Sequence, residues 1–177
     1  MDTLVAPISI QSIEVPLAEV LESDCGALYT YWNGLRGTRW APRWDEIHLI
    51  DLPAPFIPFV YVVDVLEDPF DLRFRFWGTG LTAVFKRDHT GETMLTMDLG
   101  VISDDRREKI MGDYRTLIDR KAPFAFLWDT RTAGRGRMAA PAICLPLSDD
   151  GETVTKIICG FDFTENRYDW ERLLEPR

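Results

Sequence analysis

The chain has 177 residues, of which 46% are hydrophobic, 12% aromatic and 28% charged. This length suits one domain with a full core, and the composition excludes a largely disordered chain. The formal net charge of −9 and a pI near 4.7 argue against nucleic acid and anionic membranes as partners, because both attract clustered lysine and arginine. We therefore expect one globular domain whose partners are not polyanions.

The sequence shows no sign of export, membrane insertion or metal binding. Residues 1–5 lack a basic region followed by a long apolar run, and no stretch approaches about 18 apolar residues. The three cysteines, Cys25, Cys144 and Cys159, have neither two-residue spacing nor nearby histidines. The sequence predicts a cytoplasmic protein without a membrane span, a zinc site or a disulfide framework.

The N-terminal region divides at Pro16. Residues 1–15 show no clear period and are interpreted as a partly ordered leader. Apolar residues at helical spacing predict an N-terminal helix over residues 17–35, which Gly26 weakens or divides. One or two further helical turns are expected over residues 44–50, before a proline-rich connection.

A β-hairpin follows. Residues 59–66 and 72–77 are rich in β-branched and aromatic residues and flank a turn-like segment. In the second strand a period of two places alternate residues on opposite faces. The expected core face carries Leu72, Phe74 and Phe76, and the other face carries Arg73, Arg75 and Trp77.

Two helices and three strands complete the predicted domain. A short helix is expected from Leu81 to near Arg87, and a longer one from its N-cap Ser103 to about Lys121. The inward stripe of the longer helix is Ile110, Tyr114, Leu117 and Ile118. The strands are predicted over residues 124–130, 137–147 and 153–163.

The order of elements predicts an α+β fold. Strands and helices do not alternate regularly, which disfavours a parallel doubly wound sheet and favours an antiparallel sheet of five strands. The domain is predicted to span residues 16–165, and residues 166–177 form a charged C-terminal tail.

Several spaced motifs resemble one known family, the bacterial single-domain PAS proteins of the PAS subfamily 5 type. The resemblance covers roughly residues 28–165, and one departure is the run Glu46-Ile47-His48-Leu49, which leaves the role of His48 open. The matching residues are Tyr31, Trp32, Leu35, Arg36, Gly37, Arg39, Pro42, Arg43 and Asp45, then Asp64-Val65, Phe74-Arg75-Phe76, Gly78-Thr79, Arg87-Asp88 and Thr90-Gly91.

The resemblance implies a PAS-like fold and a regulatory role. The expected architecture is a five-stranded antiparallel sheet with helices packed on one face, enclosing a pocket. It also implies an N-terminal helix that mediates a homodimer. Members of this family are mostly viewed as sensory or regulatory modules.

Catalytic and cofactor motifs are missing from the sequence. It contains no nucleophile elbow and no phosphate-binding loop, and acidic pairs fall at a helix start and a turn. His48 and His89 are both expected to be solvated, which makes a haem ligand improbable. Flavin photochemistry is not expected either, because Cys25 lies in the predicted N-terminal helix.

Three arginines form the most unusual local cluster. Arg36, Arg39 and Arg43 precede Asp45, and guanidinium groups suit bidentate pairing with carboxylate or phosphate. One hypothesis is that they contact an anionic ligand or partner. The other, which we favour, is that they fasten the N-terminal helix and its loop to the sheet.

Large side chains between sheet and helices are the candidates for a ligand pocket. Their size is sufficient to shape an apolar cavity, although aromatic stripes are more often plain core. A charged anchor stands at the start of one strand. The candidates are Phe76, Phe85, Tyr114, Phe126, Trp128 and Met138, with Arg137 as the anchor.

The sequence leads to three functional hypotheses. The first is a stand-alone PAS module that binds a small molecule or a protein partner and signals to a separate protein through contacts. The second is a small enzyme with a buried acid or histidine, for which Asp64 and His89 are the candidates. The third is a dimerisation or localisation adaptor with a filled core.

Overall fold

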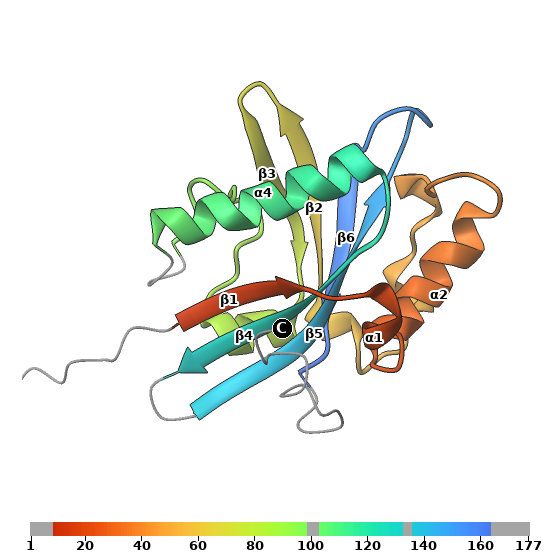
Figure 1. Ribbon diagram of the computed structural model, residues 1–177. Coiled ribbons are helices and arrows are strands. Elements are labelled where there is room, and N and C mark those ends of the chain that lie inside the picture. Colours follow the sequence, from red (N-terminus) through yellow and green to blue (C-terminus); the bar gives the residue numbers. More distant parts are fainter. Residues whose placement is uncertain (1–8, 99–102, 133–135, 164–177) are drawn as a thin grey trace, which may run out of the picture.

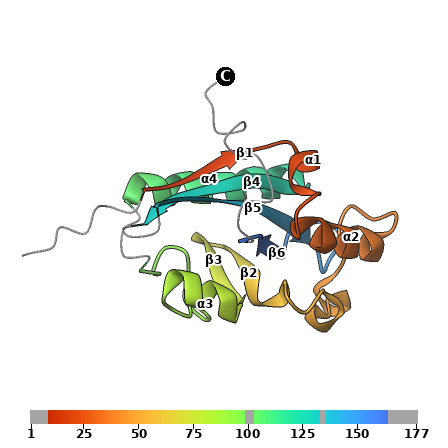
Figure 2. The ribbon, with the colours of Figure 1, turned by 90° about the horizontal axis from the view of Figure 1, so that it is seen from below.

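A six-stranded antiparallel sheet forms the centre of the protein in the computed structural model, which describes residues 9–98, 103–132 and 136–163. The strand order is β1-β4-β5-β6-β2-β3. Seen from below (Figure 2), β1, β4 and β5 lie along one side and β2 and β3 along the other, with β6 between them. The strands are β1 (Ser9–Glu14), β2 (Val60–Glu67), β3 (Phe70–Trp77), β4 (Phe124–Thr132), β5 (Gly136–Leu147) and β6 (Lys156–Phe161).

Within the described residues, four α-helices and three short 3-10 turns accompany the sheet. Figure 1 shows α4 lying across the strands and α2 to the right of the sheet. The helices are α1 (Leu17–Val20), α2 (Cys25–Arg36), α3 (Thr79–Phe85) and α4 (Asp104–Arg120), and the turns are η1 (Trp44–Glu46), η2 (Leu49–Asp51) and η3 (Ile57–Phe59).

The α+β prediction is confirmed, but the expected count of five strands is wrong. The sixth strand is β1, which lies inside the segment that the sequence suggested was a leader. Ser12 and Ile13 of β1 pair with Trp128 and Leu127 of β4, more than a hundred residues further along the chain. Which side chains of β1 are buried depends on its pairing with β4, and residues 9–14 by themselves therefore show no period.

The expectation of helices on one face only is also wrong. On one face α4 buries Met111, Tyr114 and Leu117. On the other face α2 buries Leu28 and Trp32 against a second apolar cluster. Both faces need a cover, because the described side chains of β5 and nearly all of β6 are buried whichever way they point.

The helix predicted over residues 17–35 is divided near Gly26, which was one of the two effects expected of this glycine. α1 ends at Val20 and α2 begins at Cys25. A Cβ at Gly26 would lie 2.0 Å from the carbonyl oxygen of Leu21, so this close approach needs a glycine. Both helices turn apolar side chains to the sheet, and homodimer formation through this region stays a prediction.

The longer predicted helix agrees closely with α4. Ser103 stands at the N-cap and Lys121 at the C-cap in a left-handed conformation. Of the predicted inward stripe, Tyr114 and Leu117 are buried, whereas Ile110 and Ile118 are partly buried against the same cluster. The C-terminal tail predicted over residues 166–177 lies outside the described residues.

The close approach at Gly78 gives a stability prediction. A Cβ there would lie 2.1 Å from the carbonyl oxygen of Pro58, so Gly78→Ala must displace backbone at the start of β2. We expect a loss of about 1–3 kcal/mol in the free energy of unfolding. Gly34→Ala, in α2, is the matched control, since a Cβ at Gly34 meets nothing within 4 Å. This substitution should stabilise the helix by roughly 0.5–1 kcal/mol.

Urea unfolding of both variants measures these changes. Equal midpoints for Gly78→Ala and the unsubstituted chain would contradict the close packing of Gly78, the N-cap residue of α3, against η3.

Candidate functional site

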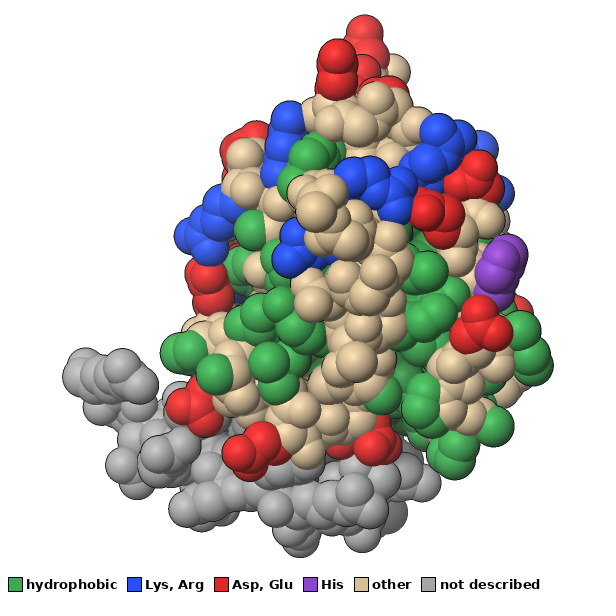
Figure 3. All heavy atoms as spheres, turned by 90° about the vertical axis from the view of Figure 1, so that its right-hand side faces the viewer, with side chains coloured by type: hydrophobic (Ala, Val, Ile, Leu, Met, Phe, Trp, Pro, Cys, Tyr) green, Lys and Arg blue, Asp and Glu red, His purple; other side chains and the backbone are tan. Residues whose placement is uncertain are grey.

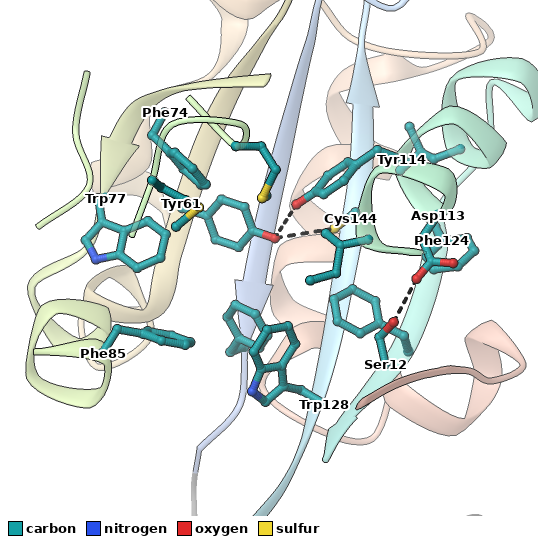
Figure 4. Close-up of a pocket in the computed structure, with 16 residues that line it drawn as sticks. Ser12, Tyr61, Phe74, Trp77, Phe85, Asp113, Tyr114, Phe124, Trp128 and Cys144 are labelled. Carbon is teal, nitrogen blue, oxygen red and sulfur yellow. Dashed lines mark hydrogen bonds between the residues drawn. The ribbon is translucent and has the colours of Figure 1, made fainter. Parts of the chain in front are cut away.

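A cavity of about 60 Å³ lies between the sheet, α3 and α4. Aromatic rings form most of its wall, and Met94, Met97 and Cys144 contribute sulphur-containing side chains. Figure 4 shows these side chains converging from the strands and from α4. The rings of Trp128 and Phe161 meet edge to face, with centroids 5.6 Å apart, which is a favourable arrangement for aromatic pairs.

Four of the predicted pocket residues lie in this wall. Phe85 comes from α3, Tyr114 from α4, and Phe126 and Trp128 from β4. Ligand binding by these residues stays a prediction. Arg137 and Met138 belong to β5, but their side chains lie outside the described part of the structure.

The prediction that Phe76 faces the pocket is wrong. The register between β2 and β3 shifts after Val62, which pairs with Phe76, because the next residue pairs with Phe74. Arg75 is therefore the extra residue of a β-bulge, and it reverses the alternation of the strand. Phe76 packs in the cluster on the opposite face, and Trp77 lines the cavity in its place.

Several wall residues were missed by the sequence reasoning. The register identifies them, because residues directly opposite in an antiparallel pair project from the same face. Trp77 lies opposite Tyr61, and Phe124 lies opposite Cys144. A period of two counted back from Phe126 would have found Phe124 in the sequence, whereas Trp77 required knowledge of the bulge.

Two buried tyrosines meet in the middle of the site. The hydroxyl oxygens of Tyr61, on β2, and Tyr114, on α4, lie 2.6 Å apart. Figure 4 shows them reaching toward each other from opposite walls. Burial raises the pKa of both phenols well above the ordinary value of 10.0, so both hydroxyls stay protonated and neutral.

A second group of polar side chains lies where β1 meets α4 in the cavity wall. Ser12 Oγ donates to Asp113 Oδ2 at 2.7 Å. Lys109 Nζ donates to both groups at 2.9 Å. This carboxylate therefore already has a cationic partner, so it is not a free anion for a ligand.

The two cavity methionines belong to a segment that is held at both sides. Arg107 of α4 donates to the carbonyl oxygens of Met94 and Met97, the latter at 3.1 Å. On the other side, Asp71 Oδ1 accepts from the backbone N–H of Leu95 at 3.2 Å. This strap, residues 93–98, carries the most deformable side chains of the wall, since methionine is unbranched and flexible.

The expectation that His89 is solvated is wrong. Its side chain is only 1% exposed. The ring stands edge to face against Trp77, with centroids 5.0 Å apart, and Nδ1 lies 2.8 Å from Glu92 Oε2. This hydrogen bond lowers the pKa of Glu92. The turn that contains His89 folds back over the edge of β3, where Gly91 and Glu92 bond to the backbone of Phe74. His89 is therefore part of the layer behind the cavity.

Neither of the two predicted catalytic candidates lines the cavity. His89 lies behind the wall that Trp77 forms. Asp64 pairs with Arg75 at 2.7 Å near the surface. His48 is exposed, as expected.

Comparison with known protein families shows which family the chain belongs to. The family model of the PAS domain, subfamily 5, matches residues 22–161. The chain belongs to the PAS domain family. Neither the comparison with curated proteins nor the one with solved structures finds a match. PAS domains are generally sensory or regulatory modules rather than enzymes.

The three arginines of this PAS domain are occupied by contacts within the chain. Arg39 donates to the carbonyl oxygen of Leu35 at the C-terminal end of α2, where carbonyl groups lack helical partners, and Arg36 donates to the carbonyl oxygen of Arg39 in the following loop. Arg39 also binds Glu46 at 2.7 Å, and Arg43 binds Asp45 at 3.0 Å. Figure 3 shows basic and acidic side chains mixed on this face. These contacts join α2 to the loop that follows it and do not run to the sheet, which the packing hypothesis required. Contact of the three arginines with an anionic ligand or partner stays a prediction.

Over residues 9–98, 103–132 and 136–163, no helix is long and apolar enough to cross a membrane. In the same ranges, no group of three or more histidine, cysteine, aspartate or glutamate side chains is placed to hold a metal ion.

The buried thiols give a prediction on reactivity. Burial raises the pKa of Cys25 to about 12, and it raises the pKa of Cys144 well above 9.0. Because the thiolate is the reactive form, alkylation by iodoacetamide at pH 8 should be at least about 100-fold slower in the native protein than in urea. Mass spectrometry of the labelled protein measures both rates. Rapid native labelling of either cysteine would contradict the described packing.

Proposed function

We propose that this PAS domain is a sensory or regulatory module that binds a small molecule in its aromatic cavity and signals through protein contacts. The observation that carries the proposal is a wall of aromatic rings that encloses a neutral pair of tyrosine hydroxyls. Mostly apolar walls with a few convergent polar groups are typical of small-molecule sites.

The volume limits what enters without rearrangement. Cavities for drug-sized ligands measure about 300–1,000 Å³. The present cavity of about 60 Å³ is far smaller. A larger ligand would displace Met94 and Met97 first, because most of the aromatic wall is held by strands and by α4.

The strap offers a route from cavity to surface. Met94 and Met97 point into the site, and Leu95 between them is 49% exposed. A ligand that moves the methionines also moves this apolar surface residue. Occupancy then changes affinity for a protein partner, which is the thermodynamic requirement for a signal.

A second candidate function is an adaptor with a filled core. The small cavity volume favours it, because an adaptor needs no room for a ligand. The enzyme hypothesis has no comparable support, since His89 and Asp64 do not line the cavity.

Native mass spectrometry and a thermal-shift screen test ligand binding. We expect a bound small molecule in gently extracted protein, or a metabolite that raises the melting temperature. Cys144→Leu should abolish the effect, because the larger side chain occupies the cavity. Ile50→Ser is the control, since Ile50 is 84% exposed and does not line the cavity.

Cys144→Leu itself should cost about 1–3 kcal/mol through overpacking, which urea unfolding checks separately. The absence of any bound molecule and of any thermal shift would favour the adaptor instead.

A further inference from the structure

The tyrosine pair has one strong hydrogen-bond donor too many. Two hydroxyls carry two protons, and the 2.6 Å separation uses one of them between the oxygens. The other proton finds only sulphur among the described residues. Cys144 Sγ lies 3.8 Å from the Tyr61 oxygen, and Cys159 Sγ lies 4.0 Å from the Tyr114 oxygen.

Thiol sulphur is a weak acceptor, so this donor is poorly satisfied. Leaving a buried donor unsatisfied costs free energy, and a ligand that supplies an acceptor recovers it. The pair therefore favours a molecule with an oxygen lone pair over a purely apolar one of the same shape.

The surroundings disfavour a charged ligand. Near the hydroxyls the wall consists of aromatic rings and sulphur-containing side chains, and an unpaired ion is costly in such a place. The nearest wall carboxylate, Asp113, is bound by Lys109, so neither charge is free to pair with a ligand. A ligand at the tyrosines should therefore be neutral.

The volume of the cavity limits the size of the ligand. At about 60 Å³ the cavity is far below the roughly 300–1,000 Å³ of sites for drug-sized ligands, so only a compound of a few heavy atoms enters without rearrangement. A larger member of the same class would enter only with displacement of Met94 and Met97.

From these three constraints we infer that the cavity takes small neutral carbonyl compounds, ketones or aldehydes, whose oxygen accepts a hydrogen bond from the Tyr61–Tyr114 pair. The inference rests on the proposed function, since it names the ligand class of the same cavity. One hydroxyl donates to the other, and the second donates to the ligand.

Three probes of similar shape test this inference on the full chain: acetone, isobutene and acetate. Acetone carries the acceptor, isobutene lacks it, and acetate adds a charge. Titrations followed by NMR shifts of cavity methyl groups measure each affinity. We expect acetone and isobutene to bind and acetate to leave the cavity signals unchanged.

The double variant Tyr61→Phe/Tyr114→Phe removes both hydroxyls. A single variant is less informative, because the remaining hydroxyl still donates. In the double variant the ratio of acetone affinity to isobutene affinity should fall about fivefold or more. The infrared carbonyl stretch of bound acetone should also move to higher frequency, since its hydrogen bond is lost.

Tyr31→Phe is the matched control. The Tyr31 hydroxyl bonds to the backbone of His48 outside the cavity, so its loss should leave the affinity ratio unchanged. Removal of both partners of a buried hydrogen bond is often nearly neutral, and we expect the double variant to fold.

The outcomes separate the two proposals. An unchanged affinity ratio in the double variant, or acetate bound as tightly as acetone, overturns the carbonyl inference while cavity binding stands. Saturable binding of none of the three probes to the unsubstituted protein overturns the carbonyl inference and counts against a ligand cavity altogether.

Discussion

The structure depends on a sheet whose central strands are buried on both faces. Every described side chain of β5, and nearly every one of β6, is removed from water. Such strands must be covered twice, so α1 and α2 serve one face while α3 and α4 serve the other. The N-terminal helices are therefore part of the core, and only their outward side is free for another protein.

An irregularity in this sheet decides which residue of β3 lines the cavity. The β-bulge at Arg75 turns Phe76 to the far face and brings Trp77 into the wall. Trp77 then supports His89, whose turn folds over the edge of β3 and leads into the strap that carries Met94 and Met97. The bulge at Arg75 thus decides that Trp77 packs against His89, and the chain after His89 carries Met94 and Met97.

The chemistry of the cavity follows from burial rather than from charge. The rings keep water away from the tyrosine hydroxyls, and burial holds both phenols neutral. A neutral donor in an apolar site discriminates by hydrogen bonding and shape, which suits a sensor of small uncharged molecules. Charged contacts such as those of Arg36, Arg39 and Arg43 instead tie surface segments together.

The sequence by itself determined the α+β class, the family, helix α4 and the hairpin of β2 and β3, because each has a local period or a spaced motif. It also placed Phe85, Tyr114, Phe126 and Trp128 between sheet and helices. Only the tertiary structure decided that residues 9–14 form a strand, that Phe76 faces away and that His89 is buried. The physical reason is that these outcomes depend on contacts between residues distant along the chain or on a register shift, neither of which a local period records.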